Sequence, residues 1–163
     1  MYKINAEARD KFLLGLEWML AVTRRYPGAL QFCLVLIKHN NYSLLGESYG
    51  AQMASRQLDE ALQSLRQAFR KTDLVARDGS DFWIMVPFSP DNEKVSDKIK
   101  YILESLSLAG LHIVERDISF FSWPLSLKDI PLSDDAQPLE VLAYLKKNQT
   151  LLAHHKVILP ASA

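Results

Sequence analysis

The residues of this chain that could do chemistry gather around one short stretch, Arg77-Asp78-Gly79-Ser80-Asp81-Phe82. Gly79-Ser80 fits a two-residue turn between two strands, because glycine supplies the positive φ that such turns require. The second arm would begin with Asp81. A further pair of charged residues, Arg70 and Asp73, stands just upstream. The hairpin and its approach are therefore the first stretch of the chain to consider for a ligand site.

Other reactive side chains lack the neighbours that catalysis needs. His39 and His112 have no serine or cysteine in a nucleophile context, so a catalytic triad has no support. The single cysteine, Cys33, lies in an apolar segment, where a thiol packs as a small hydrophobic group. His154-His155 would not form a metal site, because adjacent residues rarely point the same way and no partner ligands follow at helical spacing.

The composition is that of a globular chain with balanced charge. The 163 residues are 48% hydrophobic, which is enough for a core, and lysine plus arginine equal aspartate plus glutamate at 19 each. A balanced chain has no electrostatic footprint of a general nucleic-acid binder. No apolar run approaches the roughly 20 residues of a membrane span, and the N-terminus has no apolar signal core. We expect one cytoplasmic domain over residues 1–163, without membrane insertion.

Hydrophobic periodicity predicts the elements that would position the candidate residues. Helices are expected over 6–25, 43–48 and 51–70, from Ser89-Pro90 to before Gly110, and from Pro138 to about Leu152; strands are expected over 30–38, 74–78, 81–86, 111–123 and 156–159, and a loop over 124–137. The run over 30–38 is almost continuously apolar, which is typical of a central strand covered on both faces.

This order of elements predicts an α/β fold. Two strand–helix–strand crossovers around a hairpin indicate a ferredoxin-like βαββαβ core, with helices packed on a mixed, antiparallel-rich sheet. The helix over 6–25 has a broad apolar face, which would pack on its own domain or mediate dimers. Trp18, Trp83 and Trp123 fall among apolar neighbours, so we expect them in the core or at an interface.

The hairpin resembles the signature of the GGDEF family, the diguanylate cyclases. The family writes it Arg-x-Gly-Gly-Asp/Glu-Glu-Phe, followed by an apolar strand that often ends in proline, and residues 77–87 keep this frame. Residues 34–50 also match the family's first strand and the helix after it without gaps. The resemblance runs from about residue 12 to 123 and implies the family's nucleotidyl-cyclase-like fold.

The resemblance also implies that the catalytic set is lost. The family's magnesium-binding Asp is replaced by Lys38, and the Asn and Asp that contact guanine are replaced by Gly46 and Ser55. Gly79-Ser80-Asp81 stands for Gly-Gly-Asp, and the glutamate is absent. An ungapped alignment puts Phe82 at that glutamate, whereas a one-residue deletion puts Phe82 at the family's phenylalanine.

The replaced residues would all serve the same reaction, the magnesium-dependent joining of two GTP molecules. Joining two GTP molecules needs magnesium held by carboxylates, and a lysine has no lone pair and repels the metal. The family's late basic segment, which holds the triphosphate, has no convincing counterpart around 146–152. We therefore expect no magnesium, no cofactor and no cyclase activity; a cyclase with displaced ligands is the less favoured alternative.

Lys38 itself has two interpretations. Its ammonium would replace the metal and pair with Asp81, since the corresponding family acids share the magnesium. Alternatively, Lys38 simply lies at the exposed end of its strand.

Arg70-Lys71-Thr72-Asp73 matches the family's inhibitory site for cyclic di-GMP, an Arg-x-x-Asp five residues before the first hairpin glycine. The arginine fork can donate two hydrogen bonds to guanine N7 and O6, and the carboxylate accepts from N1 and N2. Such sites take a second arginine from another surface, which the sequence does not identify. The alternative is that Arg70 ends its helix, favourably placed against the dipole, and Asp73 starts the turn into the strand.

The favoured function is a catalytically inactive regulatory domain in bacterial signalling. It would sense cyclic di-GMP through Arg70 and Asp73 or contact a partner protein. The alternative is an interaction or dimerisation scaffold that binds no nucleotide. We expect a protein partner or a homodimer, and no nucleic acid.

Overall fold

The computed structural model describes residues 2–28, 30–88, 91–105, 113–125, 132 and 135–161. Its elements follow the predicted order. They are α1 (Tyr2–Arg25), β1 (Phe32–His39), α2 (Tyr42–Tyr49), α3 (Ala51–Ala68), β2 (Leu74–Asp78), β3 (Asp81–Pro87), α4 (Asn92–Ser105), β4 (Arg116–Trp123), α5 (Pro138–Lys147), α6 (Gln149–Leu152) and β5 (His155–Leu159).

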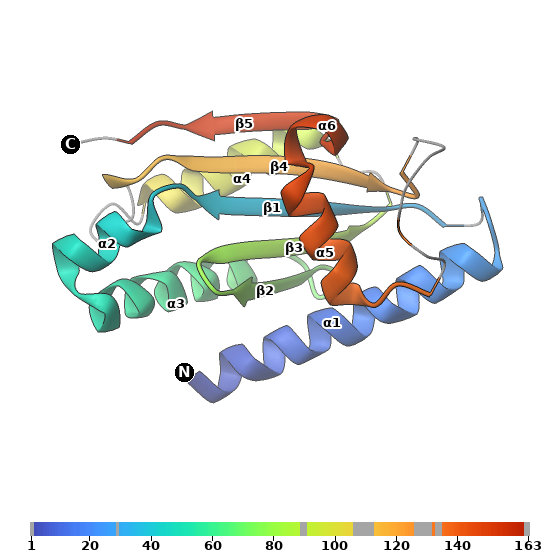
Figure 1. The fold of residues 1–163 in the computed structure, drawn as a ribbon, viewed down its shortest axis with the longest axis horizontal. Coiled ribbons are helices and arrows are strands. Elements are labelled where there is room, and N and C mark those ends of the chain that lie inside the picture. Colours follow the sequence, from blue (N-terminus) through green and yellow to red (C-terminus); the bar gives the residue numbers. More distant parts are fainter. Residues whose placement is uncertain are drawn as a thin grey trace.

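The five strands form one sheet in the order β2-β3-β1-β4-β5 (Figure 1). Every neighbouring pair is antiparallel. The reason is that the two long crossovers connect strands that are not neighbours. Helices α2 and α3 link β1 to β2 with β3 between them, and α4 links β3 to β4 with β1 between them. This is the ferredoxin-like arrangement expected from the order of elements, with β5 added at one edge.

The central strand β1 is covered on both faces, as its continuous apolar sequence predicts. Phe32, Leu34 and Leu36 face one hydrophobic cluster, and the alternate residues face the other. Cys33 is one of those alternate residues, and burial raises the pKa of its thiol to about 12. The thiol therefore packs as a hydrophobic group, as expected from the sequence.

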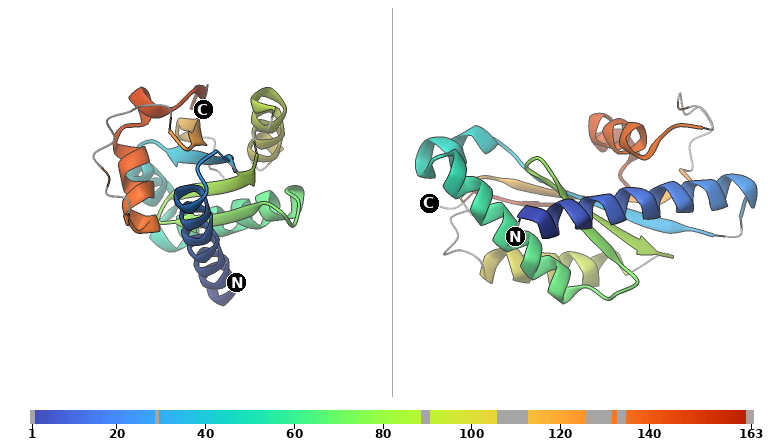
Figure 2. Two further views of the ribbon diagram at one scale, coloured as in Figure 1. Left: turned by 90° about the vertical axis from the view of Figure 1, so that its right-hand side faces the viewer. Right: turned by 90° about the horizontal axis from the view of Figure 1, so that it is seen from below.

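The helices cover the two faces in separate layers. Residues of α1 and α5 share one cluster with the sheet, and residues of α3 and α4 share the other. In the left view of Figure 2, α5 lies on one side of the sheet and α3 and α4 lie on the other. Helix α1 packs along β2 and against α5, so it closes the first face next to the hairpin.

Several boundaries differ from those predicted. Strand β4 begins at Arg116, because residues 113–115 form a short turn before it. The expected helix over 138–152 is divided at Asn148, whose φ of −110° and ψ of 30° leave the helical range. Ser89-Pro90 and Gly110, which were expected to bound α4, lie outside the described residues. Trp83 is buried and Trp123 stacks on Phe32, but Trp18 is exposed on α1.

Candidate functional site

The hairpin between β2 and β3 has the two-residue turn predicted from its sequence. Asp78 and Asp81 are register partners, which leaves Gly79 and Ser80 as the loop. Gly79 has a φ of +62°, whereas Ser80 is not among the residues with positive φ. This pattern is that of a type II′ turn, in which the first loop position favours glycine.

Three neighbouring elements hold this turn. The Arg9 guanidinium of α1 lies 3.4 Å from the Asp78 carboxylate, and His39 Nδ1 of β1 donates to the Ser80 carbonyl at 2.7 Å. The Lys146 ammonium of α5 lies 2.5 Å from the buried Asp81 carboxylate. The backbone and side chains that would carry ligands at this turn are therefore engaged within the protein.

The predicted ion pair between Lys38 and Asp81 is wrong, because Asp81 pairs with a different lysine. The β1–β3 register ends at Ile37 opposite Phe82, so Lys38 and Asp81 leave the sheet on the same face. Helix α5 lies over that face, however, and its Lys146 takes the Asp81 carboxylate. Lys38 is half-buried opposite Asp117 of β4 and has no ion pair within the described part of the chain.

On the other face of the hairpin, Arg77 clamps the turn onto α3. Its Nε donates to the Gly79 carbonyl at 2.6 Å, and its Nη1 lies 2.7 Å from Asp59 Oδ1. The same nitrogen contacts the carbonyl and the hydroxyl of Ser55 at 3.0 and 3.2 Å. The resemblance places a guanine-contacting acid at Ser55. The polar atoms of Ser55 instead accept hydrogen bonds from a guanidinium of the same chain.

Gly46 and Phe82, where the resemblance places a guanine-contacting residue and the hairpin glutamate or phenylalanine, offer no side-chain oxygen or nitrogen to a ligand. Gly46 lies within α2, where a side chain would meet no atom within 4 Å. Phe82 is fully buried in the core, and its ring makes an edge contact with His39. Both alignments of Phe82 therefore leave β3 without a second acid. No group of three or more histidines, cysteines and acids that could hold a metal occurs among the described residues.

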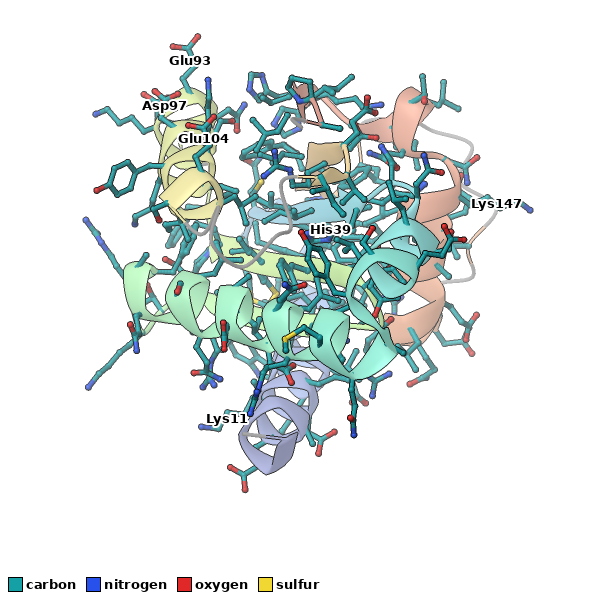
Figure 3. The ribbon with its side chains drawn as sticks, turned by 90° about the vertical axis from the view of Figure 1, so that its left-hand side faces the viewer. Lys11, His39, Glu93, Asp97, Glu104 and Lys147 are labelled. Carbon is teal, nitrogen blue, oxygen red and sulfur yellow. The ribbon has the colours of Figure 1, made fainter. Side chains whose placement is uncertain are left out.

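His39 was dismissed as a catalytic residue from the sequence, and the structure shows a positioning contact instead. Because Nδ1 donates to Ser80, the ring is the neutral Nδ1–H tautomer. Its Nε2 is buried and has no hydrogen-bond partner among the residues that the structure describes. Burial lowers the pKa of His39 to about 4, and the nearby guanidinium groups of Arg116 and Arg77 act in the same direction. Figure 3 shows His39 at the centre of this end of the molecule. His112 lies outside the described residues.

Arg70 and Asp73 lie together in a tight turn between α3 and β2. The Asp73 N–H donates to the Arg70 carbonyl at 2.9 Å, and one Asp73 carboxylate oxygen accepts from the Arg70 N–H at 3.2 Å. The Arg70 guanidinium is exposed and makes no ion pair or hydrogen bond within the described ranges. The turn thus presents an arginine fork beside a carboxylate.

This turn borders a pocket of about 620 Å³ between α1, α3 and β2. Besides Arg70 and Asp73, its lining includes the cations Lys11, Arg66 and Lys71. Lys11 belongs to α1, and Figure 3 shows it between the ribbons of α1 and α3 in that view. The pocket has the size of a small-molecule site, and four cations against one carboxylate favour an anionic ligand.

The sequence predicted the hairpin turn but not the residues that contact the hairpin. Nothing in the spacing of Lys146, Asp59 or His39 showed that the three would meet the hairpin. Lys146 is 65 residues from its partner, and His39 is 41 residues from the carbonyl that it binds. The helix-end alternative for Arg70 is confirmed only in part, since α3 ends at Ala68, two residues earlier.

Comparison with known proteins agrees with the fold. Residues 10–119 match the family model described as diguanylate cyclase, GGDEF domain. The structure of the GGDEF domain of YfiN (TpbB) from Pseudomonas aeruginosa superposes with a TM-score of 0.56 at 16% identity, covering 88% of this chain and 91% of that one. That of DgcB from Caulobacter crescentus in complex with c-di-GMP has a TM-score of 0.53 at 13% identity, covering 88% and 84%. Identities this low show the fold alone.

No curated protein matches the chain. Within the described ranges, each helix is too short or too polar to cross a membrane.

Proposed function

This chain belongs to the GGDEF family, and on that premise we propose that it is a catalytically inactive regulatory domain that binds cyclic di-GMP through Arg70 and Asp73. The observation that carries the proposal is the pocket at these two residues. It combines an exposed guanidinium fork, a carboxylate and further cations. Cyclic di-GMP offers guanine edges to the first two and phosphates to the others.

The loss of catalysis is supported by the state of the hairpin. An active site needs carboxylates free to hold magnesium. Here the Asp81 carboxylate is paired with Lys146, and the strand position before His39 carries a lysine. Arg77 bonds to Ser55 and Asp59 where the guanine of GTP would be recognised. We infer that this site binds neither magnesium nor GTP.

The additional cations of the proposed site are Lys11 and Arg66. Both line the same pocket as Arg70, one from α1 and one from α3. Sites of this kind take a further cation from another surface, and the Arg-x-x-Asp motif alone does not provide one. Lys11 and Arg66 would supply that positive charge. Since cyclic di-GMP is an intracellular messenger, the proposal also places the domain in the cytoplasm.

Isothermal titration calorimetry with cyclic di-GMP tests the proposal. The unchanged protein should bind, whereas Arg70→Ala and Asp73→Ala should each weaken binding at least about tenfold, because each removes charge-assisted hydrogen bonds of roughly 1.5–3 kcal/mol. Arg56→Ala is the matched control, since Arg56 is an exposed arginine of α3 that lines a different pocket. The absence of binding heat at high protein concentration contradicts the receptor role.

The absence of catalysis is tested separately. The protein is incubated with GTP and Mg²⁺, and cyclic di-GMP is measured by chromatography. We expect no product. Any Mg²⁺-dependent formation of cyclic di-GMP would show that displaced ligands complete the site.

A domain that binds no nucleotide and acts by contacting proteins is the second candidate. The exposed apolar side chains of α1 favour it. It predicts that Arg70→Ala and Asp73→Ala leave the biological activity of the protein unchanged, whereas the receptor role predicts that both abolish the response to cyclic di-GMP.

A further inference from the structure

The two edges of the sheet differ in what covers them. The edge strand β2 is covered, because α1 packs along it. The other edge strand, β5, runs along the upper border of Figure 1, and no strand or helix of the described chain lies beyond it. An uncovered edge strand presents unpaired N–H and C=O groups with which a further strand can pair.

The hydrogen-bond pattern of the sheet shows which backbone groups of β5 point outward. The Asn40 N–H donates to the Glu115 carbonyl at 2.8 Å, which fixes the alternation along the ladder between β1 and β4. Every second residue after Glu115 therefore bonds to β1, and the residues between them bond to β5. Their partners on β5 are His155, Val157 and Leu159. The N–H and C=O groups of Lys156 and Ile158 are thus left pointing away from the sheet.

The side chains of β5 alternate between the two faces of the sheet. Val157 packs against the cluster that α3 and α4 cover, so Lys156 and Ile158 lie on the opposite face. Ile158 is 52% exposed, which leaves an apolar side chain open beside the outward backbone groups. A strand added at this edge would gain apolar contact on the face of Ile158.

On the other face, α4 lies over β5 and carries a stripe of acids. The Ser96 hydroxyl lies 3.4 Å from His155 Nε2, which places α4 directly beside this edge. Spacings of four and seven residues put three exposed carboxylates on one face of α4. The members of this acidic stripe are Glu93, Asp97 and Glu104. Figure 3 shows them around the upper side of α4, away from α3, at the border of the molecule that β5 also forms.

The cations of α4 are distributed differently. The Lys98 ammonium lies over the Phe69 ring, 4.6 Å from its centroid, and so points toward the end of α3. Lys100 stands four residues after Ser96 and is therefore the cation on the side of β5. Three carboxylates against one ammonium leave this side of α4 negative, which favours a positively charged partner.

We propose that β5 binds an extended segment of a partner protein in which basic residues alternate with apolar ones. The backbone of the segment pairs with Lys156 and Ile158 and adds one more strand to the sheet. Its apolar side chains lie beside Ile158, and its basic side chains face the acidic stripe of α4. The site is separate from the Arg70 pocket, and its occupation does not depend on cyclic di-GMP.

A second copy of β5 has the wrong chemistry for this edge. Its side chains toward α4 are His155 and Val157, which do not form a basic row. Antiparallel pairing of two such edges would also bring the acidic stripes of both α4 helices to the same face of the joined sheet, where they repel each other. Pro160 follows β5 directly and has no N–H, so it limits the ladder at that end.

Fluorescence anisotropy with a labelled Lys-Val-Lys-Val-Lys-Val-Lys peptide tests the site. Its affinity should be at least about tenfold higher than that of the block peptide Lys-Lys-Lys-Lys-Val-Val-Val, because only alternation places all lysines on one face of a strand. Equal affinities of the two peptides would show that charge alone holds them, and this result, like the absence of binding, would overturn the proposal.

Changes at Ile158 test the pairing of the backbone. Ile158→Pro removes an outward N–H but no bond to β4, so it should weaken binding of the alternating peptide about tenfold or more. Ile158→Ala keeps the N–H and should weaken binding only about two- to threefold, through lost apolar contact. Circular dichroism confirms that both variants are folded. Equal losses in the two variants would mean that the backbone does not pair.

Neutralising the acidic stripe tests the charge on the partner. The double change Glu93→Gln with Asp97→Asn should weaken binding of the alternating peptide about tenfold at low ionic strength, where screening is weakest. Glu17→Gln with Glu60→Gln removes the same number of exposed carboxylates from α1 and α3 and is the matched control. Equal effects of the two double changes would refute the placement of the basic side chains against α4.

Amide hydrogen exchange locates the bound peptide directly. In the free chain the N–H groups of Lys156 and Ile158 face solvent, and saturation with the alternating peptide should slow their exchange at least about tenfold. Binding that leaves both groups unprotected would place the peptide elsewhere and contradict the added strand.

Discussion

The Arg77 guanidinium connects the hairpin turn to α3 through several hydrogen bonds. One guanidinium binds the hairpin turn at Gly79 and the first half of α3 at Ser55 and Asp59. Buried polar groups need partners, and the partners of this guanidinium come from within the chain. Arg77 thus connects the hairpin turn to α3.

His39 also connects two elements, β1 and the hairpin turn, and its protonation depends on pH. Its ring is buried against Phe82 and donates to the Ser80 carbonyl. A proton on Nε2 would be buried without a partner, which is why burial lowers the pKa of His39 to about 4.

We therefore expect the free energy of unfolding to fall as the pH drops. The unfolded chain binds a proton at His39 near its ordinary pKa of about 6.5, whereas the folded chain does so only near 4. Stability is full above the unfolded value and is lost between the two, by up to about 3 kcal/mol. Urea titrations from pH 7 to pH 4 measure this slope.

The control for this prediction is a change at His39 itself. His39→Asn keeps a donor at the Nδ1 position but does not titrate, so the slope should flatten. A His39→Asn protein with the original pH dependence would contradict this assignment.

At the scale of elements, Gly79 and Gly46 have similarly open surroundings but different backbone conformations. A side chain at Gly79 or at Gly46 would meet no atom within 4 Å. Gly79, however, has a positive φ in the hairpin turn, and Gly46 lies inside α2 without one. Only the backbone conformation distinguishes them.

Replacing each with alanine should therefore change stability in opposite directions. Gly79→Ala should destabilise the protein by about 1–2 kcal/mol, because an L side chain is strained at that φ. Gly46→Ala should stabilise it by up to about 1 kcal/mol through helix propensity. Thermal unfolding measures both. Equal effects of the two changes would show that the turn does not need the left-handed conformation.

At the scale of the molecule, one ion pair joins the C-terminal part to the hairpin. Lys146 lies on α5, and Asp81 begins β3, 65 residues earlier. The carboxylate is only 8% exposed, whereas the lysine is partly open to solvent. Removing the lysine would leave a buried charge without its described cation, which is costly.

Lys146→Gln should therefore lower the free energy of unfolding by about 1–2 kcal/mol. The adjacent exposed Lys147 offers a control of the same residue type on the same helix. Lys147→Gln should change stability by no more than about 0.5 kcal/mol. Denaturant titration compares the two, and equal losses would mean that the pair with Asp81 contributes nothing.

Local pattern was enough to determine the elements and much of the fold. The apolar run of β1, the glycine of the turn and the helical stripe of α3 each depend on neighbours within one element. Their order restricts the topology, because crossovers around a hairpin have few arrangements. The expectation that Lys38, Gly46 and Ser55 replace family residues likewise comes from the sequence alone.

Only the tertiary structure decided which groups meet. The partner of Asp81 is Lys146 and not Lys38, because α5 lies over that face of the sheet. The cations of the Arg70 pocket come from α1, from α3 and from the turn that follows α3. Trp18 is exposed because α1 turns that face outward. Contacts between residues far apart in sequence depend on how elements pack. Periodicity within one element shows which face is apolar but not what covers it.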